Sequence, residues 1–98
     1  MTEAQLRARV LARGRRLGLL VFSAADSRRS TGPGYPDLTI AGPGGVLWAE
    51  LKSAGGTTSP EQDLWGWTLR QSGQQWRLWR PADWADETIL AELAKLAS

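Results

Sequence analysis

Residues 37–52 read DLTIAGPGGVLWAELK and are the most informative segment of the chain for its fold. Two short runs in it, 38–41 and 46–52, alternate in side-chain character, which predicts two half-buried strands. The four residues between them, Gly42-Pro43-Gly44-Gly45, are typical of a tight hairpin loop. The stretch therefore predicts an antiparallel hairpin.

The register of this hairpin brings three charged side chains together. If Ala41 pairs with Val46, Asp37 lies opposite Glu50. Directly opposed residues have Cβ atoms about 4.5–5.5 Å apart on one face. Lys52 points to the same face as Glu50 because it stands two residues further along the strand. Two carboxylates and one ammonium are expected at one end of the hairpin.

Two carboxylates this close repel each other when both are ionised, so the site needs a proton or a cation. A hard divalent ion fits, since Mg²⁺ takes one or two protein carboxylates, keeps several waters and also binds phosphate. Lys52 is then free to steer a water or to offset charge on a phosphate. Such a site suits metal-assisted phosphodiester hydrolysis. The plainer alternative is that Pro36-Asp37 ends a turn and Glu50 and Lys52 form an ordinary strand ion pair.

The rest of the chain predicts five more elements around the hairpin and a loop over 24–36. In chain order the elements are a helix over 3–17 capped by Thr2, a strand over 19–23, a helix from Pro60 to about Gln71 with a Ser59/Gln62 capping box, a strand over 75–79, and a last helix capped by Asp83. The order is α-β-β-β-α-β-α, a mixed α/β (α+β) sheet flanked by helices, in one domain spanning 1–98.

Apolar periodicity predicts which side chains of these elements are buried. The expected set is Leu6, Val10 and Leu17 on the first helix with Arg13 or Gly14 between them, Trp65 and Leu69 on the second, Trp76 and Leu78 on the last strand, and Ile89, Leu93 and Leu96 on the last helix. Gly66 is expected to weaken the middle of its helix.

Composition excludes several classes of enzyme. The 98 residues include no cysteine and no histidine. Disulfides, zinc–thiolate sites, iron–sulfur clusters, thiol nucleophiles and histidine bases are therefore ruled out. An enzyme of this composition must use carboxylates, Lys, Arg, Tyr, Ser, Thr or a metal held by oxygen.

Charge and hydropathy give a weaker indication of partners. Seven arginines fall within residues 1–29. A basic amino-terminal part points modestly to nucleic acid, and a solvated helix face is the plain alternative. No apolar run approaches the length of about 18 residues that a membrane span needs, and the start lacks a signal-peptide core. A cytoplasmic protein without membrane contact is expected.

A resemblance to a known family rests on several short motifs in order. GPGYPDLTI (32–40) and GGVLWAELKS (44–53) form a PD-(D/E)xK signature with twelve residues between its two acids. The chain resembles the VRR-NUC nucleases over nearly its whole length. The further matching stretches are DSRRS (26–30), SPEQDLW (59–65) and WRPADW (79–84), together with an early Glu in the first helix.

The resemblance implies a restriction-endonuclease-like core and cleavage of DNA with Mg²⁺ or Mn²⁺. It makes Asp37 and Glu50 metal ligands, with the Leu51 carbonyl as a third. It makes Lys52 the residue that positions or activates the attacking water. No organic cofactor is implied.

Other matched positions extend the site. Glu3 corresponds to a helix carboxylate beside the metal, and Gln62 to a helix glutamine near it, although its capping box alone would explain that glutamine. Arg28, Arg29 and Ser30 are expected to clamp phosphate, or else to be solvated loop residues. There are two departures: Gly66 replaces an aromatic residue found in some relatives, and Ser23 replaces a frequent histidine.

The expected activity is that of a DNA endonuclease, of a phage or prophage type that selects branched DNA such as four-way junctions or flaps. Two alternatives stay open: a nicking or restriction-like nuclease without structure preference, and a DNA-binding subunit without activity. The complete set of Asp37, Glu50 and Lys52 argues against the last.

Six tryptophans are many for a chain of this length. Trp65 and Trp76 are assigned to the core, and Trp48 is expected beneath the carboxylates. The remaining three, Trp67, Trp79 and Trp84, exceed what so small a core can hold. Exposed aromatic residues are enriched at interfaces, so a homodimer is expected.

Overall fold

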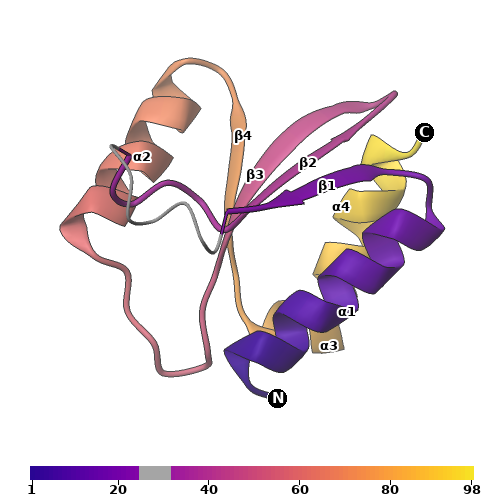
Figure 1. Ribbon diagram of the computed structural model, residues 1–98, viewed down its shortest axis with the longest axis horizontal. Coiled ribbons are helices and arrows are strands. Elements are labelled where there is room, and N and C mark those ends of the chain that lie inside the picture. Colours follow the sequence, from indigo (N-terminus) through magenta and orange to yellow (C-terminus); the bar gives the residue numbers. More distant parts are fainter. Residues whose placement is uncertain (25–31) are drawn as a thin grey trace.

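A computed structural model describes residues 1–24 and 32–98. The expected phosphate clamp of Arg28, Arg29 and Ser30 lies outside the described residues. The elements are α1 (Glu3–Arg16), β1 (Leu20–Ser23), β2 (Leu38–Gly42), β3 (Gly45–Leu51), α2 (Pro60–Gln71), β4 (Gln75–Trp79), α3 (Pro81–Ala85) and α4 (Thr88–Leu96) (Figure 1). This order confirms the prediction, except that the last helix is divided in two.

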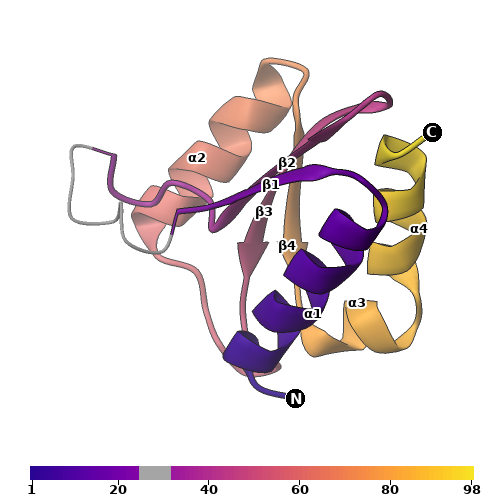
Figure 2. The same cartoon turned by 45° about the vertical axis from the view of Figure 1, so that its right-hand side comes forward.

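The sheet is mixed, as predicted, with the strand order β1-β2-β3-β4. β1 and β2 are antiparallel, β2 and β3 are antiparallel, and β3 and β4 are parallel. A parallel pair needs a crossover connection, and α2 supplies it. α2 lies on one side of the sheet, and α1, α3 and α4 lie on the other (Figures 1 and 2).

The predicted hairpin register is confirmed. Ala41 pairs with Val46, and the pairing continues to Leu38 opposite Ala49. The loop is shorter than expected, because Gly42 also pairs with Gly45 and leaves only two residues between the strands. Gly45 adopts a φ of 131°, a conformation that favours glycine at this tight connection.

The main core lies between the sheet and the helices α1 and α4. Its buried members are Leu6, Val10, Leu19, Leu38, Ile40, Leu47, Ala49, Leu51, Trp79, Ile89, Leu93 and Leu96. The prediction for α4 is confirmed. The prediction for Leu17 is wrong: α1 ends one residue earlier, and Leu17 is 38% exposed. Of the two residues expected between Val10 and Leu17, Gly14 completes the buried stripe, and an added Cβ there would lie 2.9 Å from Val21 Cγ2.

The sequence suggested that Gly66 weakens the middle of α2. In the structure this glycine also has a packing role. It is the one buried residue of α2, whose predicted capping box is present, and the indole of Trp76 packs directly against it. A Cβ at this position would lie 2.8 Å from Trp76 Cε2. The glycine therefore lets α2 approach β4 closely. Trp76 is buried as predicted, while Trp65 and Leu69 are only half-buried.

Gly66→Ala is expected to lower the free energy of unfolding. A methyl group forced against a buried ring costs about 1–3 kcal/mol, and the better helix propensity of alanine returns at most about 1 kcal/mol. Urea unfolding followed by circular dichroism measures the difference. Gly55→Ala is the control, since nothing lies within 4 Å of its added Cβ. Equal stability of the two variants would contradict the packing argument.

The carboxy-terminal segment corrects two predictions. Asp83 is not the N-cap of the last helix. It stands at the third position of α3, where its carboxylate accepts a hydrogen bond of 2.8 Å from the backbone N–H of Arg80. The helix divides at Glu87, which has a left-handed φ of 67°.

A membrane-spanning helix must be both long and apolar, and none of the helices within residues 1–24 and 32–98 meets this requirement.

Candidate active site

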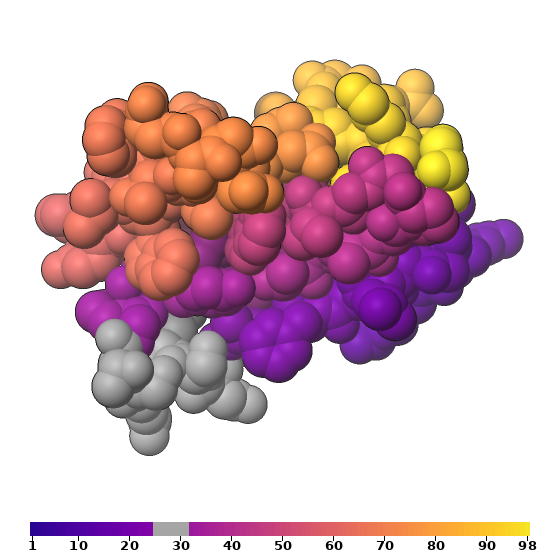
Figure 3. All heavy atoms as spheres, turned by 90° about the horizontal axis from the view of Figure 1, so that it is seen from above, coloured from indigo at the N-terminus to yellow at the C-terminus, as the bar shows by residue number. Residues whose placement is uncertain are grey.

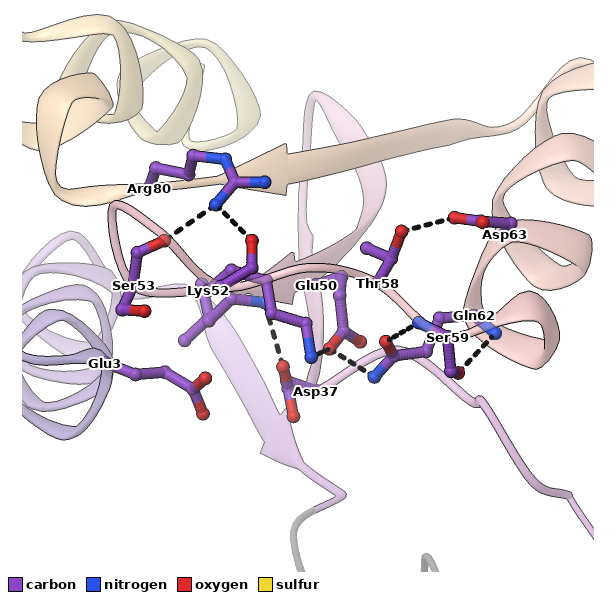
Figure 4. A network of polar contacts seen from close by, with 12 residues as sticks. Glu3, Asp37, Glu50, Lys52, Ser53, Thr58, Ser59, Gln62, Asp63 and Arg80 are labelled. Atoms are coloured by element: carbon purple, nitrogen blue, oxygen red, sulfur yellow. Dashed lines mark hydrogen bonds and ion pairs between the residues drawn. The ribbon is translucent and has the colours of Figure 1, made fainter.

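Asp37 and Glu50 form the centre of the site, at the end of the β2–β3 hairpin. Asp37 immediately precedes β2, and Glu50 is the next-to-last residue of β3. Their side chains are 0% and 1% exposed. Asp37 Oδ2 accepts a hydrogen bond of 2.8 Å from the backbone N–H of Leu51, which ties the aspartate to the end of β3. Figure 4 shows the two carboxylates close together.

Arg7 of α1 provides a positive charge to Asp37. Its Nη2 atom lies 3.2 Å from Asp37 Oδ1 and 3.6 Å from Glu3 Oε2. Its Nη1 atom donates to Ser23 Oγ at 3.3 Å, so the last residue of β1 also contacts this arginine. Glu3 thus faces the site, as Figure 4 shows, and is connected to Asp37 through Arg7.

Arg7 was not among the residues that the sequence pattern indicated. The only local signal was its position four residues after Glu3, a spacing at which opposite charges meet on a helix. Its contact with Asp37 spans 30 residues of sequence. That contact depends on how α1 packs across the sheet, which the sequence pattern does not specify.

Glu50 is contacted by one residue just after β3 and by one residue of α2. Lys52 Nζ lies 3.8 Å from Glu50 Oε2, and Gln62 Nε2 donates to the same oxygen at 2.7 Å. Gln62 also forms the capping box, since its Oε1 atom accepts from Ser59 N at 2.9 Å. The cap fixes the amide so that its nitrogen points to Glu50. The Gln62 side chain therefore both caps α2 and contacts Glu50, so the two interpretations of this residue are compatible.

Arg80 stabilises the loop that follows Lys52 and leads to α2. Its Nη1 atom donates to the carbonyl oxygens of Ser53 and Gly56, each at 2.7 Å. Figure 4 shows this arginine above the loop. The sequence pattern does not indicate Arg80 either, because its partners are backbone carbonyls, which no side-chain motif marks. The arginine therefore fixes the backbone that directly follows Lys52.

An aromatic cluster lies on the α2 side of the sheet. Trp48, two residues before Glu50, donates from Nε1 to the Tyr35 hydroxyl at 3.1 Å. The rings of Tyr35 and Trp65 meet edge to face with centroids 4.9 Å apart. Trp65 Nε1 donates to the Pro33 carbonyl at 3.1 Å. Through these contacts, β3, α2 and the segment before Asp37 are joined beside the site.

The structure therefore gathers most of the predicted residues. Asp37, Glu50, Lys52 and Gln62 are linked by direct contacts or by the Leu51 amide, and Glu3 joins them through Arg7. Within residues 1–24 and 32–98, no group of three or more acidic, histidine or cysteine side chains is placed to hold a metal.

Comparisons with known proteins place the fold. No family model matches the sequence, and no curated protein matches it. A solved structure described as a VRR_NUC domain protein is similar over 98% of this chain and 90% of its own, with a TM-score of 0.71 and 20% sequence identity. The restriction-endonuclease-like architecture expected from the sequence is confirmed at the level of the fold.

Proposed function

The chain has the fold of a VRR_NUC domain protein, and on this basis we propose that it is a divalent-metal-dependent DNA endonuclease that hydrolyses phosphodiester bonds. One observation carries the proposal. Two carboxylates, Asp37 and Glu50, are almost completely buried together, with Lys52 and Arg7 beside them. Burying two like charges is costly, and proteins retain such pairs where a cation or a reaction uses them.

The donor set fits Mg²⁺ or Mn²⁺. Hard divalent ions prefer carboxylate and carbonyl oxygens, and Mg²⁺ needs only one or two protein carboxylates when water and phosphate complete its shell. Asp37 and Glu50 would supply the two carboxylates, and the Leu51 carbonyl the third protein oxygen. When bound, the ion would polarise the phosphate and lower the pKa of a water.

The surrounding side chains have separate tasks in this proposal. Lys52 is a charged donor next to Glu50, with only 17% of its side chain exposed, so its ammonium is well placed to orient a water or a phosphate oxygen. Gln62 holds Glu50 in place through its amide. Hydrolysis then forms a bond from the water oxygen to phosphorus and breaks the bond to one ester oxygen.

Cleavage is expected to depend on metal and on DNA structure. A panel of labelled duplex, flap, splayed-arm and four-way-junction DNAs with Mg²⁺ tests both, since EDTA should stop cleavage and Mg²⁺ or Mn²⁺ should restore it. We expect junctions or flaps to be cut preferentially. Equal cutting of every DNA would favour the nicking or restriction-like alternative. Binding without cleavage under all conditions would favour a DNA-binding subunit.

A homodimer belongs to the same proposal, because resolving a junction takes two symmetric cuts and each chain has one site. The tryptophans are less exposed than the sequence suggested. Trp79 is 1% exposed, since β4 directs it into the core opposite Trp76, and Trp84 packs partly against that core. Of the three surplus tryptophans only Trp67 is strongly exposed, at 62%.

Strand β1 offers a better apolar surface. Leu20 and Phe22 are 76% and 59% exposed. They stand two residues apart on this edge strand, so their side chains lie on the same face. In Figure 3, β1 lies at the surface along one side of the molecule. Sedimentation at micromolar concentration is expected to give a dimer, and Phe22→Ser is expected to shift it toward monomer. A monomer that cuts flaps would contradict the dimer and favour a flap or nicking activity.

A further inference from the structure

A basic groove runs between α1 and α3. It has a volume of about 270 Å³ and is lined by Arg9, Ala12, Arg13, Arg16 and Trp84. Figure 2 shows α1 and α3 side by side, with α1 in front. These arginines are separate from the site already described, where Glu3 and Arg7 of the same helix reach Asp37. The lining of this basic groove contains three positive charges and no acid.

The charge of the basic groove is not neutralised by the described parts of the chain. Of the ion pairs within residues 1–24 and 32–98, none involves Arg9, Arg13 or Arg16. The acids of the α3 segment have other tasks. Asp83 accepts from the Arg80 backbone N–H, and Asp86 accepts from the Thr88 backbone N–H.

The spacing of the three arginines suits a phosphate backbone. Positions 9, 13 and 16 stand on one side of α1, four and then three residues apart, and span about 10 Å along the helix at 1.5 Å per residue. One strand of DNA places a phosphate about every 3.4 Å along its axis, so the same length covers about three nucleotides.

The arrangement also costs helix stability unless an anion is present. Like charges three or four residues apart on a helix repel each other by about 0.2–0.5 kcal/mol per pair. A polyanion lying along the groove would attract all three arginines and so offset their mutual repulsion. Arginine, the sole basic residue type in the lining, forks onto phosphate oxygens more effectively than lysine does.

We propose that the basic groove binds the sugar-phosphate backbone of a double-stranded DNA arm beyond the cleaved bond. This rests on the proposed function, since it takes DNA as the substrate. The same helix would then serve two purposes. Its first turns support Asp37, and its later turns hold the duplex that leads away from the site.

Fluorescence anisotropy with a labelled duplex in EDTA tests the proposal without cleavage. Arg13→Gln should reduce the slope of log K against log salt by about 0.9, the contribution of one phosphate contact. The triple variant Arg9→Gln/Arg13→Gln/Arg16→Gln should bind at least about tenfold more weakly and lose roughly 2–3 units of slope. Glutamine preserves helix propensity, and circular dichroism checks folding.

Arg15→Gln is the matched control, because Arg15 is exposed on the same helix and does not line the groove. It should leave the salt slope unchanged. Equal losses for Arg13→Gln and Arg15→Gln would overturn the proposal, since net charge alone would then explain them. Binding of a labelled poly-glutamate peptide as tight as that of DNA would also overturn it, in favour of an acidic protein partner.

Failure of this proposal is distinguishable from failure of the proposed function. If the unaltered protein cleaves DNA with Mg²⁺ while the triple variant binds duplex normally, only the groove assignment is wrong. If the unaltered protein never cleaves but the triple variant loses duplex binding, the groove stands and the nuclease proposal is wrong.

Discussion

Asp37→Asn is expected to abolish Mg²⁺-dependent cleavage while DNA binding in EDTA is retained. Replacing the carboxylate by an amide removes a charged oxygen from the proposed metal site but keeps an acceptor for the Leu51 N–H. Changes to residues that merely support metal ligands cost 10–100-fold in metal affinity or activity, so losing a ligand should cost more than about a hundredfold. Glu50→Gln is expected to behave in the same way.

Lys52→Ala distinguishes metal binding from the chemical step. The ammonium is a donor and not a ligand, so this variant should lose cleavage while its metal affinity, measured by calorimetry, stays near that of the unaltered protein. Lys95→Ala is the control, since Lys95 is an exposed lysine in the last turn of α4. Normal turnover by the Asp37→Asn protein would rule out the assignment of the site.

Arg7→Met is expected to destabilise the metal-free protein and to make its stability more responsive to metal. Asp37 is completely buried, and Arg7 lies against it with 19% of its side chain exposed. A hydrogen bond to a charged group contributes about 1.5–3 kcal/mol. For a domain of this size that corresponds to a fall in Tm on the order of 10 °C.

The second part of this prediction concerns Mg²⁺ itself. Arg7 supplies positive charge to the carboxylate that would hold the ion, so removing the arginine leaves more negative charge for Mg²⁺ to neutralise. Thermal unfolding with and without Mg²⁺ should show a larger increase in Tm for Arg7→Met than for the unaltered protein. Arg15→Met, an exposed change on the same helix, is the control. Equal Tm increases in all three proteins would contradict the role of Arg7 at the proposed metal site.

Local chemistry made much of this protein predictable from its sequence. The alternation of 38–41 and 46–52 fixed the hairpin register, because a shift by one residue would turn every apolar side chain to the opposite face. That register alone brought Asp37 beside Glu50. The Ser59/Gln62 capping box was equally visible, since its hydrogen bonds join residues three apart. The period of apolar side chains and the hydrogen bonds between near neighbours are properties of a single segment, so the sequence alone predicts them.

The tertiary structure decided what depends on one element crossing another. The sequence does not specify where α1 crosses the sheet, so Arg7 emerged as the partner of Asp37 only in three dimensions. Gly66 gained its role from the approach of the Trp76 ring, and Trp79 its burial from the pairing of β4 with β3. Arg80 binds backbone carbonyls, which every residue possesses and no sequence pattern marks. These contacts join residues 10 to 30 positions apart, and their geometry is set by packing of the whole core.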